Sequence, residues 1–223
     1  MILPEDREHL QREGYLLIRR VLSPSRVASL LHELPEGAAG LRKALQWPAV
    51  SALSLDPTIL RLIEDLAGEP LTPVRGLLFN KTPNANWAVG WHQDLALALR
   101  ERRDVEGFGP WSVKAGVPHA HAPAWLLERM ITLRFHLDRC TNQEGPLRVV
   151  PRSHRQGRMS SSEAAEWERQ PGVTCLAEPG DALAMPPLLL HASHSAAEPT
   201  RRRVLHLEYG PAPLPGGLEW ARA

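Results

Sequence analysis

Residues 131–150 read ITLRFHLDRCTNQEGPLRVV, and this stretch decides the fold. Ile131 to Leu137 is rich in β-branched and apolar residues, and Leu147 to Val150 repeats that character. The polar segment from Asp138 to Gly145 between them has the composition of a turn. A short strand, a turn and a second short strand are therefore predicted.

The same rhythm of short apolar runs separated by Pro, Gly and Asn extends on both sides. Further candidate strands are Val74 to Asn80, Val89 to Gln93, Leu95 to Leu99, Val173 to Leu176, Ala182 to Met185, Leu188 to His191 and Val204 to Tyr209. Many short strands without long helices between them argue against Rossmann and TIM-barrel folds. They favour a mainly β protein of the α+β class, built as a jelly roll.

The first third of the chain carries helix start and stop signals instead. Pro4 opens a helix that Gly14 ends, Ser23-Pro24 precedes Val27 to Leu34, and Asp56-Pro57 precedes Ile59 to Ala67. Tyr15 to Ile18 is a short strand candidate. We expect a single domain over residues 1–223, with residues 1–69 as helical support packed on one sheet and residues 70–210 as the jelly roll.

One segment, Arg100 to Arg129, interrupts the strand pattern. It contains several Gly and Pro residues together with Trp111 and Trp125. Long irregular segments inside compact domains are commonly functional, and embedded tryptophans favour order. We interpret residues 100–129 as a mostly irregular lid insertion over a pocket, with a decorated surface loop as the alternative.

Composition excludes several kinds of partner. The chain has 223 residues and 26 Lys plus Arg against 25 Asp plus Glu, so its charge gives no case for nucleic acid or a membrane surface. No apolar stretch approaches the length of a membrane span, and the N-terminus lacks a secretory pattern. Two cysteines are too few for a disulfide framework. A cytoplasmic protein that acts on a small molecule is expected, and the sequence does not indicate an oligomeric state.

Three His-x-acid pairs are candidate metal sites, because alternate residues of a strand share one face. They are His92-Gln93-Asp94, His136-Leu137-Asp138 and His206-Leu207-Glu208. Such a pair and a distant third ligand form the facial triad of non-haem iron enzymes. Composition alone yields roughly one such pair, so spacing does not decide among them.

Position favours the first pair. His206-x-Glu208 ends the last strand and has no ligand downstream, so a solvated or structural pair is expected there. Asp138 could instead satisfy turn backbone. His92-x-Asp94 precedes the lid and has His191 or His194 as third ligand, of which we prefer His191 because it ends an apolar run.

A 2-oxo acid that chelates the metal needs a cation for its far carboxylate, and the guanidinium fork of Arg suits this role. Arg202 is the candidate, although Arg201 and Arg203 are not excluded by spacing. Ser193 could add a hydroxyl group.

An ordered set of segments resembles the phytanoyl-CoA dioxygenase family. The segments are Phe79-Asn80-Lys81-Thr82-Pro83, Trp91-His92-Gln93-Asp94, Gly145-Pro146-Leu147-Arg148-Val149-Val150-Pro151-Arg152-Ser153-His154, Gly180-Asp181-Ala182-Leu183, His191-Ala192-Ser193 and Arg202-Arg203-Val204-Leu205. The resemblance implies a double-stranded β-helix, which is a cupin-like jelly roll. It also implies an enzyme that uses Fe(II), O2 and 2-oxoglutarate as co-substrate.

By matched position, the resemblance makes His92, Asp94 and His191 the iron ligands, and Arg202 with Ser193 the binders of the distal carboxylate. Arg134, Trp111 and Lys81 are further cofactor-binding candidates that it suggests, and Arg134 departs from the aromatic residue that can stand there in the family. In related halogenases a small residue replaces the acid, whereas this chain has Asp94. Hydroxylation or desaturation is therefore expected.

The substrate is left open. The chain has no clear basic surface for a CoA nucleotide, so a small metabolite or an apolar acyl or terpenoid compound fits as well as a CoA ester. Two alternatives to the oxygenase remain at this point. They are a cupin-like metal-dependent isomerase or hydrolase, which needs no 2-oxoglutarate, and a non-catalytic jelly-roll binding protein.

Overall fold

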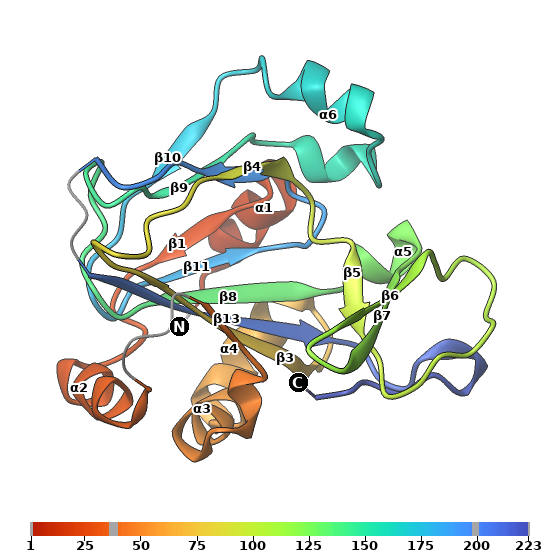
Figure 1. Cartoon of the computed structure of the whole chain (residues 1–223), viewed down its shortest axis with the longest axis horizontal. Coiled ribbons are helices and arrows are strands. Elements are labelled where there is room, and N and C mark those ends of the chain that lie inside the picture. Colours follow the sequence, from red (N-terminus) through yellow and green to blue (C-terminus); the bar gives the residue numbers. More distant parts are fainter. Residues whose placement is uncertain (1, 36–39, 198–200, 223) are drawn as a thin grey trace.

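The fold is described from a computed structural model over residues 2–35, 40–197 and 201–222 (Figure 1). Its helices are α1 (Pro4–Glu13), α2 (Pro24–Glu33), α3 (Pro48–Ser54), α4 (Pro57–Ala67), α5 (Ala124–Leu127) and α6 (Ser161–Trp167), with short 3-10 turns η1 (Ala44–Gln46), η2 (Ser153–Gln156) and η3 (Pro215–Gly217). None of the described helices is long and apolar enough to cross a membrane.

The strands are β1 (Leu16–Ile18), β2 (Gly40–Arg42), β3 (Thr72–Lys81), β4 (Val89–His92), β5 (Ala96–Ala98), β6 (Trp111–Lys114), β7 (Val117–His121), β8 (Ile131–His136), β9 (Leu147–Val149), β10 (Val173–Cys175), β11 (Ala182–Met185), β12 (His191–Ser193) and β13 (Arg202–Gly210). They form a six-stranded sheet ordered β1-β11-β8-β13-β3-β2, a four-stranded sheet ordered β10-β9-β12-β4 and a three-stranded sheet ordered β5-β7-β6.

The two larger sheets face each other as a jelly roll (Figure 1). Val149 of the four-stranded sheet and Leu183 and Met185 of the six-stranded sheet belong to one buried cluster between them. All strand pairs in these sheets are antiparallel. The predicted fold class is confirmed.

Strict alternation along β8 and β13 separates the core from the site. Leu133 and Phe135 of β8 and Leu205 and Leu207 of β13 face outward and join the large cluster that contains the apolar residues of α1 to α4. Each buried side chain of this kind contributes about 1.5–3 kcal/mol, so this face anchors the helices. The prediction that N-terminal helices pack on one sheet is confirmed. The other face of the same strands is left to line the interior.

One expectation about secondary structure is wrong, and one strand and two helices lacked a prediction. The run Leu188 to Leu190 is not a strand: β12 begins only at His191, and the three leucines are buried in the turn before it. Apolar runs report burial, which a turn also provides. Strand β2 and helices α3 and α6 were not predicted, although the capping box of Ser160 and Glu163 marks the start of α6.

The segment 100–129 combines irregular stretches with a few short regular elements. It contains β6, β7 and α5, and Ala115 and Gly116 join β6 to β7 with φ angles of +50° and +76°. Two positive φ values suit a tight hairpin turn. The rest of the segment, which is more than half of it, lies outside helices and strands, so the prediction of mostly irregular structure is confirmed.

Candidate metal centre

The side chains of His92, Asp94 and His191 converge at the mouth of the jelly roll. His92 ends β4 and is paired in register with His191 at the start of β12. Asp94 Oδ1 lies 3.8 Å from Nε2 of His92, and its Oδ2 lies 3.6 Å from Nε2 of His191. Their ligand atoms all lie within 4.8 Å of one another. Two imidazoles and one carboxylate are a donor set that fits Fe(II) and leaves coordination positions open.

Backbone carbonyls fix the orientation of both imidazoles. Nδ1 of His92 donates a hydrogen bond to the Gly90 carbonyl, and Nδ1 of His191 donates to the Leu189 carbonyl, each at 2.8 Å. Because a carbonyl only accepts, each ring carries its proton on Nδ1 and keeps the lone pair of Nε2 for a metal.

The charges of the three groups suit metal binding. Burial lowers the pKa of His191 to about 4 against the opposing attraction of Asp94, so this imidazole is neutral at pH 7. Burial disfavours ionisation of Asp94, but the imidazoles of His191, His206 and His92 outweigh it and hold its pKa below the ordinary value. His191 and Asp94 therefore present a neutral imidazole and an ionised carboxylate, which are the protonation states that a metal requires.

Gln93, between the first two ligand candidates, points away from them and ties three loops together. Its Nε2 donates to the carbonyls of Gly157 and Leu188, and its Oε1 accepts from the N–H of Met159. The N–H of Asp94 also donates to Pro187. The segment that carries Asp94 is thus held against the turn that leads to His191.

Replacing Gln93 with leucine should weaken metal binding by about 10–100-fold, because it removes all three hydrogen bonds that position the ligand loops. Fe(II) or Co(II) titration of the apoprotein measures this effect. The change Gln170→Leu, at an exposed position remote from the triad in sequence, is the control. Equal metal affinity in the two variants would show that Gln93 does not position the ligands.

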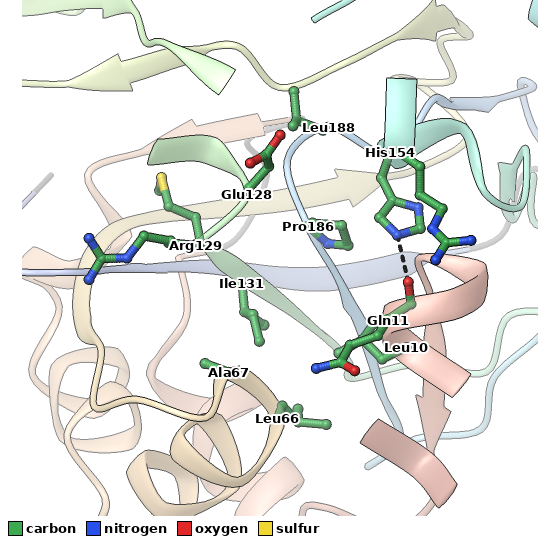
Figure 2. A pocket seen from close by; sticks show the side chains of 12 residues that line it. Leu10, Gln11, Leu66, Ala67, Glu128, Arg129, Ile131, His154, Pro186 and Leu188 are labelled. Carbon is green, nitrogen blue, oxygen red and sulfur yellow. Dashed lines mark hydrogen bonds between the residues drawn. The ribbon is translucent and has the colours of Figure 1, made fainter. Parts of the chain in front are cut away.

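The segment Pro151-Arg152-Ser153-His154 docks the loop after β9 and supports His191. The hydroxyl of Ser153 accepts from the N–H of Leu190, the residue before His191. Arg152 pairs with Glu13, and Nε2 of His154 donates to the Gln11 carbonyl at the end of α1. Figure 2 shows this His154 contact beside a cavity of about 320 Å³. None of the three candidate ligands lines that cavity.

An inner chamber of about 90 Å³ adjoins the triad, and Arg202, Ser193 and Arg134 line it. Arg202 is buried and donates from Nη1 to the Gly145 carbonyl, whereas its Nε has no partner. A buried guanidinium with an unused donor fits a carboxylate as its partner. The geometry brings Arg202 and Ser193 together with the triad.

The three consecutive arginines have different environments. Arg203 points to the opposite face of β13 and forms two hydrogen bonds with the carboxylate of Asp138. Arg201 is exposed. Only Arg202 of the three lines the chamber. The alternation of side chains along β13 therefore selects Arg202 as the candidate carboxylate binder, which spacing alone did not. Asp138 is correspondingly turned away from His136.

His206 and Glu208 lie beside the candidate site, a location that the sequence did not predict for them. Nε2 of His206 lies 4.0 Å from Asp94 and 3.3 Å from Glu208, and Glu208 pairs with Arg75 at 3.0 Å. His206 Nδ1 contacts Nη1 of Arg134 at 2.8 Å. Of the two forms expected for this pair, solvated or structural, the structure shows the structural one, since both residues are buried. Their even spacing from Arg202 along one strand is the signal that places them on the same face.

Three other candidates lie apart from the triad. Trp111 packs with Leu97 and Ala120 in a separate apolar cluster and lines neither the inner chamber nor the cavity next to it. Lys81 is buried and donates to the carbonyl of His194, and burial, with repulsion from Arg202, lowers its pKa to about 8. His194 is exposed, which favours His191 as the third ligand.

A wider outer cavity of about 560 Å³ adjoins His92 and Asp94, and Arg202 does not line it. Its walls come from β2, β3, the segment before β4 and the β6–β7 hairpin. They include Arg42, Phe79, Trp87 and Lys114, and His92 and Asp94 lie at the boundary with the inner chamber. This volume lies in the range of small-molecule sites.

Known proteins with this fold include several enzymes of one chemical class. The sequence model described as "Phytanoyl-CoA dioxygenase (PhyH)" matches residues 10–204. The alpha-ketoglutarate-dependent carbocyclase SnoK from nogalamycin biosynthesis aligns with a TM-score of 0.74 and 18% identity, over 95% of this chain and 85% of its own. No curated protein sequence matches the chain.

Two further structures were solved with ligands. The epimerase SnoN, in complex with Fe3+, alpha ketoglutarate and nogalamycin RO, aligns with a TM-score of 0.71 and 20% identity, over 95% of this chain and 90% of its own. HygX from Streptomyces hygroscopicus, with nickel and 2-oxoglutarate bound, aligns with a TM-score of 0.67 and 20% identity, over 95% and 88%. At sequence identities this low, these structural alignments establish a common fold and nothing more specific.

Proposed function

The chain belongs to the phytanoyl-CoA dioxygenase family, and from that premise we propose that it is an Fe(II)- and 2-oxoglutarate-dependent oxygenase that hydroxylates a small molecule. His92, Asp94 and His191 would hold the iron. When bound, the iron would activate O2, which is the oxidant, and 2-oxoglutarate would supply two electrons; one oxygen atom of O2 would enter succinate, with release of CO2, and the other the hydroxylated product.

One observation carries the proposal: a two-imidazole, one-carboxylate cluster shares a chamber with a buried arginine that has an unused donor. A metal-dependent isomerase or hydrolase needs the first feature but has no use for the second. An anion of the size of a dicarboxylate satisfies both, with one end toward the triad and the other at Arg202.

The residues around the chamber orient and shield the co-substrate in this assignment. Arg202 and the hydroxyl of Ser193 bind its far carboxylate. Arg134, held by His206 and lying with Cζ 5.3 Å from the centre of the Phe79 ring, forms part of the wall. Burial of this wall excludes water, which strengthens the hydrogen bonds to the carboxylate.

Hydroxylation is favoured over halogenation because Asp94 supplies a carboxylate donor where a halogenase needs space for halide. The fold itself supports several reactions, since proteins of similar structure are a carbocyclase and an epimerase.

We propose that the substrate, a small molecule, lies in the outer cavity beneath residues 100–129. We also propose that residues 1–223 form a single domain.

The decisive test is an anaerobic titration of metal-free protein with Fe(II) and then 2-oxoglutarate. A visible charge-transfer band is expected, and both His92→Ala and Arg202→Ala should weaken it. Fe(II) binding without any band that depends on 2-oxoglutarate would favour the isomerase or hydrolase. Absence of Fe(II) binding with a folded protein would refute a catalytic metal centre.

A further inference from the structure

The outer cavity carries positive charge from two separate parts of the chain. Arg42, on β2, and Lys114, on β6, both line it, together with Arg75 of β3. The two strands belong to different sheets, at the edge of the six-stranded sheet and in the β6–β7 hairpin (Figure 1). A ligand that contacts both cations would therefore bridge the hairpin and the jelly roll.

Strand register explains why Arg42 faces the cavity. Arg42 is the partner of Leu77 on β3, and cross-strand partners share a face of the sheet. Leu77 lines both the outer cavity and the inner chamber. The neighbouring partners, Leu41 and Leu78, point the other way and pack with the helices. The inward orientation of Arg42 is thus set by the backbone pairing.

The alternation of side chains along β6 likewise explains why Lys114 faces the cavity. It shares a face of the hairpin with Ser112, whose partner is His119, and His121 follows on that face. His121 also lines the cavity. Trp111, one residue out of phase with Ser112, belongs to the apolar cluster on the other side. The hairpin thus turns Trp111 and Ala120 to the apolar cluster and Lys114 and His121 to the cavity.

Few negative charges oppose these cations. Arg75 forms an ion pair with Glu208 and so already has a partner. Within the described part of the chain, neither Arg42 nor Lys114 forms an ion pair with a carboxylate. The carboxylate of Asp94 belongs to the metal site. Arg42 and Lys114 thus face the cavity with no carboxylate of the described residues at ion-pair distance, and Glu208 acts on both only from farther away.

The cations also repel one another, which raises the free energy of their charged forms. Burial lowers the pKa of Lys114, and repulsion from Arg75 and Arg42 lowers it further, against a smaller opposing attraction from Asp94 and Glu208. Burial lowers the pKa of Arg42 in the same way, with Arg75 as the next cause. A bound anion between them would relieve this repulsion, which is a source of affinity that a neutral ligand lacks.

We propose that the substrate is an anion, with a carboxylate or phosphate group bound by Arg42 and Lys114 and an apolar body against Phe79 and Trp87. This inference specifies the substrate class of the proposed oxygenase, and it rests on that proposed function for the reaction that the bound anion undergoes. The anchor at the rim orients the apolar body toward His92 and Asp94.

The test measures binding directly, by isothermal titration of anaerobic protein loaded with Fe(II) and 2-oxoglutarate. The anionic probes are 2-naphthoate, octanoate and phenyl phosphate, and the neutral probes are 2-naphthamide and octanamide. Excess 2-oxoglutarate occupies the Arg202 chamber, so a probe that still binds does so elsewhere. We expect at least one anionic probe to bind at least tenfold more tightly than the neutral probes.

Charge-matched variants separate the two cations from net charge. Arg42→Gln and Lys114→Gln should each weaken binding of the anion by about tenfold, and the double variant by about a hundredfold. The control double variant, Arg61→Gln with Arg102→Gln, removes the same charge at exposed positions that do not line the cavity. It should bind the anion like the wild type.

The outcomes distinguish this inference from the proposed function. Equal affinity for anionic and neutral probes, no binding of any anionic probe, binding that excess 2-oxoglutarate abolishes, or equal losses in the two double variants would each overturn the anionic substrate. The charge-transfer band is recorded in the same samples. If the band is absent while Arg42 and Lys114 still bind the anion, the oxygenase assignment fails and the anion site stands.

Discussion

Replacement of Asp94 with alanine should abolish the formation of succinate and product from 2-oxoglutarate. Asp94 is the only carboxylate in the described cluster with the two imidazoles. Its loss removes both a metal–oxygen bond and the charge that balances the ion. Loss of a supporting residue typically costs about 10–100-fold in metal affinity or activity, so loss of a direct ligand should cost more, on the order of 10³-fold. Succinate release and Fe(II) titration measure the two effects.

Asp138→Ala is the matched control, because Asp138 also follows a histidine by two residues. Its carboxylate accepts hydrogen bonds from the backbone and side chain of Arg203 instead of facing the triad. We expect this variant to lose some stability and to keep its metal affinity and turnover. Wild-type turnover in Asp94→Ala, or loss of Fe(II) binding in a folded Asp138→Ala, would reverse the choice between the two pairs.

The jelly roll was predictable because short alternating strands dominate residues 70–210. β8 illustrates why: its odd residues, Ile131, Leu133 and Phe135, are apolar and pack on the helices, while Arg134 faces the interior. An alternation of apolar and polar residues can be recognised in the sequence before any tertiary contact is known. The run Leu188 to Leu190 had no such period, and burial without alternation was mistaken for a strand.

The candidate site was predictable only in part. His-x-Asp spacing proposed three pairs, and the first was preferred by its position and by family resemblance. Glu208 and His206 were set aside because no ligand follows them in sequence, yet antiparallel pairing of β13 with β8 and β3 brings them to the interior beside the site. Arg42 was not considered, because β2 is too short to be recognised before its pairing with β3 is known.

Replacement of Arg202 with alanine should raise the apparent Kd for 2-oxoglutarate by about 10² or more and leave Fe(II) affinity nearly unchanged. Charged hydrogen bonds contribute about 1.5–3 kcal/mol each, and the guanidinium fork can form two with one carboxylate. About 3 kcal/mol corresponds to slightly more than a hundredfold in affinity. Arg202→Lys keeps the charge but loses the fork, so an intermediate loss is expected.

Arg203→Ala controls for the loss of a neighbouring charge on the same strand. Arg203 lies on the opposite face of β13, where its partner is Asp138. This variant should keep its affinity for 2-oxoglutarate, because its side chain does not line the inner chamber. Titration of the charge-transfer band gives the co-substrate affinity, and prior Fe(II) titration gives the metal affinity separately. A parallel fall in both affinities for Arg202→Ala would mean that Arg202 supports the fold of the site and does not bind the carboxylate. A selective fall in 2-oxoglutarate affinity, absent in Arg203→Ala, would assign the carboxylate to the inward face of β13.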